Sequence, residues 1–322
     1  MHLTKKAISE RIREIDVVIE LLDARLPGSS ANPMLAELTS SKPTLKILNK
    51  QDLADPECTA QWLAYYNQQP GVAAEGSGQV AAVKGPKPQP VTRAIGLDAS
   101  MTAPAQRLIQ ACHELAPQRG GLTKPLRVLI CGIPNVGKST LINSLAGKRA
   151  AKTGDEAGVT KLEQRIALAP DFYLYDTPGM LWPRIIVAQS GYNLAASGAV
   201  GRNAFDDEEV ALALVAYLKL HYQGLLEARF KLQMKPGMDD DALLQEIGRK
   251  RGALLDRGRV NLQKAAEIVI HEFRSATLGR ITLETPEEFL QWLAEGQQLD
   301  AERLLKKKNR ASKTSRQETQ RS

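Results

Sequence analysis

The feature that most constrains this chain is the octapeptide Gly-Ile-Pro-Asn-Val-Gly-Lys-Ser at residues 132–139, which matches GxxxxGK[ST] at every fixed position. An apolar, β-branched segment precedes it and an apolar helical segment follows it. This context predicts a phosphate-binding loop, because glycines let backbone N–H groups close around phosphates and the helix start adds its positive dipole end. A chance glycine-rich turn is the alternative, which the match of both motif and context disfavours.

This loop supplies most of the nucleotide-binding candidates. Lys138 is expected to reach the β- and γ-phosphates and to act in catalysis, and the Ser139 hydroxyl is expected to bind Mg²⁺. The full candidate set here is Asn135, Val136, Gly137, Lys138, Ser139 and Thr140.

A second motif, Asp-Thr-Pro-Gly at residues 176–179, follows an apolar strand and lies 38 residues after Lys138. A lone DxxG is usually a turn, but at this place in P-loop nucleotidases the acid reaches the Mg²⁺ shell and the glycine N–H meets the γ-phosphate. We therefore expect Asp176 to be a metal ligand and Gly179 to act in binding and catalysis. Thr160, between the motifs, is expected to add its hydroxyl to Mg²⁺ and close over the γ-phosphate; an ordinary turn residue is the alternative.

The third motif, Asn-Lys-Gln-Asp at residues 49–52, follows another apolar segment. Asp52 could accept hydrogen bonds from guanine N1–H and the 2-amino group, whereas adenine would leave the acid unpaired at a cost in free energy. Asn49 is expected to brace neighbouring loops and the Lys50 stem to lie along the base. A helix-capping aspartate is the alternative, but a complete phosphate motif in the same chain favours binding of GTP and GDP.

The order of these motifs is unusual, because residues 49–52 precede the phosphate loop by about eighty positions. Strands alternating with helices nevertheless predict an α/β, doubly wound, mostly parallel sheet, in which a cyclic reordering of strands keeps the loops adjacent. We assign residues 1–184 to this nucleotide-binding domain, with a flexible insertion at about 68–92. Residues 98–100 take the place of a further guanine-contacting loop, but the usual Ser-Ala-Lys is absent.

Helical spacing of apolar residues dominates the rest of the chain, which predicts a small all-helical domain at residues 185–305. The loop after Gly179 leads directly into it, so we expect the bound nucleotide to reorient this domain. Residues 306–322 carry seven basic side chains and one acid, whereas the other 305 residues have a net charge of +1. We expect this basic tail to be disordered and either merely solubilising or an electrostatic tether to a nucleic acid.

Composition narrows the class of protein further. The three cysteines form no CxxC pair, which fits a reducing compartment, and no stretch is apolar enough for a membrane span. The start lacks the apolar core of a signal peptide. These features predict a cytoplasmic protein with no membrane partner, which we expect to be a monomer.

Taken together, the motifs resemble those of the circularly permuted GTPases of the YlqF/RbgA ribosome-biogenesis type. Most of the chain carries the resemblance, and few other families share this order of motifs. Its further marks are Asp-Ala-Arg-Leu-Pro at 23–27, Ser-Ala-Asn-Pro at 30–33, Gly-Val-Thr at 158–160, and the segments at 264–266 and 278–280.

The resemblance implies hydrolysis of GTP to GDP coupled to late assembly of the large (50S) ribosomal subunit, with rRNA and ribosomal proteins as partners. An RNA- or ribosome-binding protein that binds GTP with negligible hydrolysis is the alternative. The complete set of nucleotide motifs argues against a vestigial site.

The resemblance also raises two questions about catalysis. Met180 stands where Ras-like proteins place a catalytic glutamine, and the family uses an N-terminal histidine from a Pro-Gly-His-Met sequence instead. Either that histidine lies upstream of Met1, which we favour, or His2 substitutes for it. Asn135 resembles an asparagine that accompanies a K⁺ site in related GTPases; an uninvolved loop residue is the equal alternative.

Overall fold

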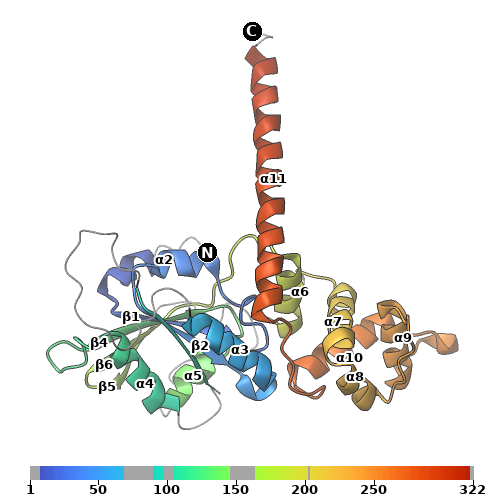
Figure 1. Ribbon diagram of the computed structural model, residues 1–322, viewed down its shortest axis with the longest axis horizontal. Coiled ribbons are helices and arrows are strands. Elements are labelled where there is room, and N and C mark those ends of the chain that lie inside the picture. The colour runs from blue at the N-terminus through green and yellow to red at the C-terminus, as the bar shows by residue number, and fades with distance from the viewer. Residues whose placement is uncertain (1–7, 69–89, 98–103, 146–163, 202–203, 320–322) are drawn as a thin grey trace.

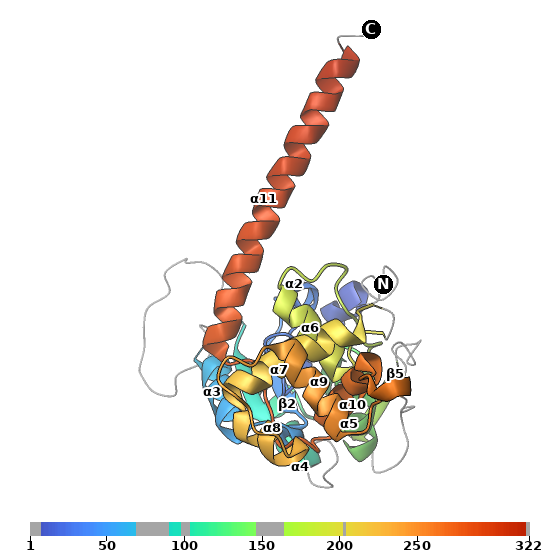
Figure 2. The same cartoon turned by 90° about the vertical axis from the view of Figure 1, so that its right-hand side faces the viewer.

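The computed structural model describes residues 8–68, 90–97, 104–145, 164–201 and 204–319, with side chains described as far as Lys307. A twisted sheet flanked by helices forms one side of the molecule, and a group of helices forms the other (Figure 1). One long helix rises from between them and carries the C-terminus away from the body (Figures 1 and 2).

The sheet has six strands in the order β3-β2-β1-β4-β6-β5. Every neighbouring pair is parallel except β5 with β6. Central strands of such a sheet are covered on both faces, which explains why they read as nearly continuous apolar runs. The predicted doubly wound, mostly parallel sheet is confirmed. The strands are β1 (Val17–Asp23), β2 (Thr44–Asn49), β3 (Thr92–Gly96), β4 (Leu126–Gly132), β5 (Gln164–Ala169) and β6 (Phe172–Asp176).

Helices cover both faces of the sheet, and alternate residues of β1 show the two layers. Ile19 and Leu21 belong to the core shared with α4 (Pro104–Leu115) and α5 (Lys138–Leu145). Val18 packs with α2 (Pro33–Thr39), and Leu22 with α3 (Pro56–Asn67). The period of two along a strand therefore assigns one set of β1 side chains to each layer.

The second group of helices has a hydrophobic core of its own. Helix α7 (Asp207–His221) is typical of how these helices begin: the Asp206 side chain accepts hydrogen bonds from the backbone of Glu208 and Glu209 at 2.8 and 3.4 Å. Acidic residues in that first turn favour the helix start, as the sequence predicts. The other helices are α6 (Ala188–Ser197), α8 (Gln223–Phe230), α9 (Asp240–Lys250) and α10 (Leu262–Arg274), and short 3₁₀ turns occur at η1 (Ile12–Glu14), η2 (Gln51–Leu53) and η3 (Asp256–Gly258).

Among the residues whose side chains the structure describes, the last helix, α11 (Pro286–Thr319), packs through its base. The rings of Phe289 and Trp62 lie 5.8 Å apart, which joins this base to α3. At Gly296 a Cβ atom would come within 2.7 Å of the Ile186 carbonyl, so glycine is what lets the helix approach the segment after β6 so closely.

The backbone of α11 stays helical as far as Thr319, whereas the sequence predicts a disordered tail from Lys306. After Gly296 the helix contains neither glycine nor proline, and it is rich in strong helix formers such as lysine, arginine, alanine and glutamate. Helix propensity therefore continues the helix past the last residues that pack on the body. Within the part of the chain that the structure describes, no helix combines the length and apolar character needed to cross a membrane.

Candidate nucleotide-binding site

The three sequence motifs meet at one edge of the sheet. The loop at 132–139 follows β4, the loop at 176–179 follows β6, and the loop at 49–52 follows β2. Because β1 pairs in parallel with both β2 and β4, the carboxyl ends of these strands lie together, which is where ligands bind in open α/β sheets. The Asn49 amide donates to the Val136 carbonyl at 2.7 Å, so the early loop does reach the phosphate loop.

The phosphate loop has a backbone that depends on its glycines. Gly137 has a φ of +96°, and a Cβ atom there would lie 2.3 Å from the Asn49 side-chain nitrogen. The loop therefore needs glycine both for its conformation and for the contact with residue 49. Ser139 is half-buried and Thr140 is exposed at the start of α5, where backbone N–H groups and the helix dipole favour an anion.

Lys138 and Asp176 form a buried ion pair beneath this loop, with the lysine Nζ 2.6 Å from the carboxylate Oδ1. Burial outweighs the attraction of Lys138 and raises the pKa of Asp176. The other carboxylate oxygen, Oδ2, is buried without a hydrogen-bond partner among the described residues. A buried oxygen that lacks a partner fits a bound cation, which is the role that the sequence predicts for Asp176.

No group of three or more His, Cys, Asp or Glu side chains among the described residues could hold a metal by itself. That finding is compatible with Mg²⁺, which is usually held by one or two protein oxygens together with phosphate oxygens and water. The Asp176 carboxylate and the Ser139 hydroxyl are of the chemical type that such a site needs.

Gly179 lies directly against the phosphate loop. A Cβ atom on it would come within 3.0 Å of the Pro134 Cα, so any larger residue would push the two loops apart. The Met180 backbone N–H donates to the Gly132 carbonyl at 3.2 Å, and the Met180 side chain is buried. The thioether at this position offers no group that could orient a water molecule.

On the base side of the site, Lys50 adopts a left-handed backbone conformation with a φ of 62°. Its ammonium donates to the Asn135 carbonyl at 2.8 Å and to Asp23 Oδ2 at 2.9 Å. Burial lowers the pKa of Lys50, and Asp23 only partly offsets this effect. Asp52 is exposed in η2, so its carboxylate is accessible to a ligand at this end of the site.

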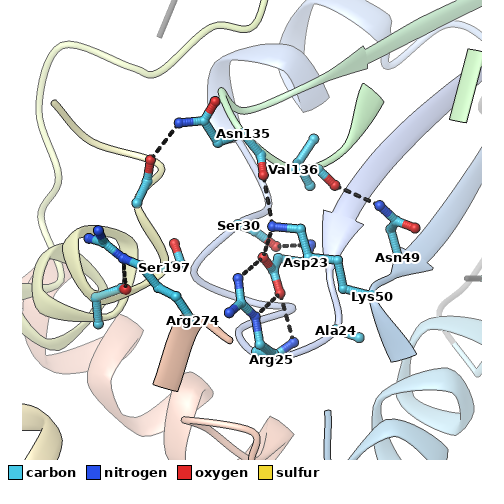
Figure 3. A network of polar contacts seen from close by, with 12 residues as sticks. Asp23, Ala24, Arg25, Ser30, Asn49, Lys50, Asn135, Val136, Ser197 and Arg274 are labelled. Carbon is cyan, nitrogen blue, oxygen red and sulfur yellow. Dashed lines mark hydrogen bonds and ion pairs between the residues drawn. The ribbon is translucent and has the colours of Figure 1, made fainter. Parts of the chain in front are cut away.

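The buried residues Asp23 and Arg25 form a cluster with the partly exposed Lys50 at the end of β1 (Figure 3). The Arg25 guanidinium donates two hydrogen bonds to the Asp23 carboxylate, at 2.9 and 2.8 Å. Burial alone would raise the pKa of Asp23, but the charges of Arg25 and Lys50 outweigh it and hold that pKa well below its ordinary value. The motifs predict no role for Asp23 and Arg25 in the site; the available signal was the Asp-Ala-Arg-Leu-Pro segment at 23–27, which brings two opposite charges to the end of an apolar strand.

A second contact links the phosphate loop to the helical region (Figure 3). The Asn135 amide donates to the Gly198 carbonyl at 2.8 Å, just beyond α6. Arg274, at the end of α10, donates to the carbonyls of Ala196 and Ala195, both at 2.8 Å, and so fixes this end of α6.

Four sequence predictions fall wholly or mostly outside the described residues. Thr160 lies in the segment 146–163, His2 in 1–7, and the loop at 98–100 in 98–103, and most of the insertion expected at about 68–92 lies in 69–89. Of the remaining candidates, the structure brings the phosphate loop, Asp176, Gly179, Asn49, Lys50 and Asp52 to one edge of the sheet.

This fold and these loops define a P-loop nucleotide-binding protein of the GTPase class, with its segments in circularly permuted order. The family described as "50S ribosome-binding GTPase" matches residues 127–232. The chain is 39% identical over 289 residues to Ribosome biogenesis GTPase A of Bacillus cereus, covering 90% of this chain and 93% of that protein. It is 38% identical over 296 residues to Ribosome biogenesis GTPase A of Priestia megaterium, with 89% and 95% covered.

The fold is also similar to that of GNP-bound YlqF from T. maritima, with a TM-score of 0.58 and 23% identity over 88% of this chain and 98% of that chain. The protein belongs to the ribosome biogenesis GTPase A family. The resemblance inferred from the motifs is confirmed.

Proposed function

We propose that this protein binds GTP with Mg²⁺, hydrolyses it to GDP, and acts as an assembly factor in late maturation of the large ribosomal subunit. The observation that carries the proposal is the meeting of three loops at one edge of the sheet around a buried carboxylate oxygen that lacks a partner among the described residues. The family names of the relatives supply the link to the ribosome.

The phosphate end of the site would work as follows. Lys138 leaves its pairing with Asp176 and neutralises charge on the β- and γ-phosphates. Asp176, Ser139 and Thr160 would hold Mg²⁺, which would further neutralise the phosphate charge. Backbone N–H groups of 135–140 and of Gly179 bind the phosphate oxygens.

At the base end, Asp52 accepts hydrogen bonds from guanine, while Asn49 and Lys50 hold the two loops together. Because Met180 cannot orient the attacking water, that task would fall to an N-terminal histidine, for which His2 is the candidate in this sequence. Asn135 is the candidate for a K⁺ site beside the phosphates; equal rates in Na⁺ and K⁺ would contradict this assignment.

The partners would be rRNA and ribosomal proteins of the large subunit, and we expect the protein to act in the cytoplasm as a monomer. Arg303, Lys306 and Lys307 are exposed along α11, and such a basic face favours contact with RNA phosphates. The close approach of Gly296 to the Ile186 carbonyl joins this helix to the segment after the Gly179 loop. A shift of that loop with the γ-phosphate would therefore reach α11.

The test is GTP turnover with and without large ribosomal subunits over a series of salt concentrations. We expect stimulation by the subunits that weakens as salt rises, and no stimulation at any salt would contradict the proposal. D52A should weaken binding of GDP by at least about tenfold, because the guanine N1–H and amino group lose their acceptor. E57A, an exposed carboxylate of the adjoining helix, is the matched control and should bind GDP normally.

A further inference from the structure

One oxygen atom at the nucleotide site is shared by two cations. Asp23 Oδ2 accepts a hydrogen bond from Arg25 Nη2 at 2.8 Å and one from Lys50 Nζ at 2.9 Å. Lys50 in turn donates to the Asn135 carbonyl of the phosphate loop. The strength of the contact between Asp23 and Lys50 therefore depends on the position of Arg25. If Arg25 moves away, its positive charge no longer offsets the carboxylate, and the net attraction that Lys50 experiences at this site increases.

The position of Arg25 depends on the helical region. Its guanidinium Cζ lies 5.0 Å from the ring centroid of Phe273, near the end of α10. Arg25 is 2% exposed, and its Nη1 has no hydrogen-bond partner among the described residues. The negative face of an aromatic ring attracts a desolvated guanidinium strongly, so the ring is a substantial part of what holds this side chain.

The next residue of the same helix supports a second route to the phosphate loop. Arg274 fixes the end of α6 through the carbonyls of Ala195 and Ala196, and just beyond it the Gly198 carbonyl accepts from Asn135. Two chains of contacts therefore connect α10 with Asn135. The first runs from Phe273 through Arg25, Asp23 and Lys50 to the Asn135 carbonyl. The second runs from Arg274 through the end of α6 to the Asn135 amide. Figure 3 shows the polar contacts of both routes, from Arg25 through Asp23 to Lys50 and from Arg274 to the end of α6, on either side of Asn135.

We infer that Asp23 and Arg25 are positioning residues that make guanine-nucleotide affinity depend on how α10 docks against the nucleotide domain. The inference rests on the proposed function. Coupling between two sites is reciprocal, so a partner that shifts α10 would change nucleotide affinity by the same factor as the nucleotide changes affinity for that partner. The helical region would in this way set how long the nucleotide stays bound.

The chain offers a matched pair of variants for a test. Phe273 and Phe230 are 1% and 2% exposed, and each carries an arginine 5.0 Å above its ring, Arg25 and Arg251 respectively. Only Phe273 belongs to the route described. F273L should weaken binding of a fluorescent GDP analogue by about fivefold or more, whereas F230L should change it less than about twofold at a similar loss of thermal stability. Equal effects of the two variants would overturn the inference.

A double-mutant cycle tests the route itself. K50M keeps the stem of this partly exposed side chain but removes its contacts with Asp23 and Asn135. In the K50M background F273L should change the affinity less than about twofold; a full fivefold effect there would overturn the route through Lys50. If F273L does not fold, R25K replaces it, with R251K as control. Failure of the unaltered protein to bind GDP would instead overturn the proposed function, and this inference with it.

Discussion

The nucleotide edge of the sheet and the interface with the helical region both bury carboxylates, but the two regions differ in how completely the carboxylate oxygens are hydrogen-bonded. At the nucleotide edge, Asp176 pairs with Lys138 through one oxygen and leaves the other without a partner among the described residues. At the interface, Glu284 accepts from the Ser29 backbone at 2.7 Å, from the Ser29 hydroxyl and from the Asn193 amide at 3.1 Å. The first arrangement suits a group that exchanges partners, and the second suits a group that joins segments permanently.

Asp23 is the last residue of β1 and so lies at the nucleotide edge, but its hydrogen bonding resembles that of Glu284 at the interface. Both of its oxygens accept from cations, and its backbone N–H donates to the Ser30 hydroxyl at 3.0 Å. The comparison therefore predicts that changing Asp23 lowers the stability of the fold more than changing Asp176 does, whereas changing Asp176 mainly affects the chemistry.

The largest effect should come from D23A. Removing this carboxylate leaves Arg25 and Lys50 without their shared partner, and breaking a buried ion pair in this way costs about 3–5 kcal/mol of unfolding free energy. Chemical denaturation measures it. D52A, which removes an exposed carboxylate from the same site, should change stability by less than about 0.5 kcal/mol. Similar losses in both variants would contradict the comparison.

The next effect concerns Glu284, whose pKa burial raises from 4.5 to about 7 even though Ser29 and Asn193 oppose the shift. The unfolded chain loses this proton at lower pH, so the free energy of unfolding falls between about pH 4.5 and 7 and is level above that range. The difference amounts to about 3 kcal/mol.

E284Q does not ionise, so its unfolding free energy should lack this part of the pH dependence. Denaturation at a series of pH values measures the effect, and E287Q, an exposed glutamate of the adjoining helix, should behave like the unaltered protein. A pH profile of E284Q that parallels the unaltered protein would show that this carboxyl does not titrate with folding.

D176N should lower Mg²⁺-dependent GTP turnover by about 100-fold, because a neutral amide is a much weaker metal ligand than a carboxylate. The amide oxygen can still accept from Lys138, so the unfolding free energy should fall by less than about 1.5 kcal/mol. D171N, at the opposite end of β6, is the control for both measurements. A large loss of stability with turnover retained would reverse the roles that the comparison assigns.

The smallest effect on the body of the protein should come from deleting residues 306–322. The base of α11 keeps its contact between Phe289 and Trp62, so GDP affinity and stability should be unchanged. Affinity for large ribosomal subunits should fall, and its dependence on salt should flatten by about one unit of slope for each RNA phosphate that the tail no longer neutralises. An unchanged salt slope would leave the tail with a solubilising role alone.

Much of the site could be predicted because the residues expected to contact the phosphates, the metal and the base lie in short local motifs. Lys138 and Asp176 were predicted as partners of one ligand, and the structure pairs them directly. The contact of Asn49 with the phosphate loop was expected from the strand arrangement and is present at Val136. By contrast, nothing in the sequence indicated that Phe273 would lie over Arg25, since the two residues are far apart in the chain and belong to separate regions of the fold.

The sequence by itself determined the class of fold and the loops that meet the nucleotide, because apolar periodicity and glycine positions act over a few residues. Tertiary structure alone decided which groups share partners. One oxygen of Asp23 accepts hydrogen bonds from two cations, and the Glu284 carboxylate accepts from the loop at 28–29 and from α6. These outcomes depend on burial and on distances between segments remote in the chain, which local patterns do not encode.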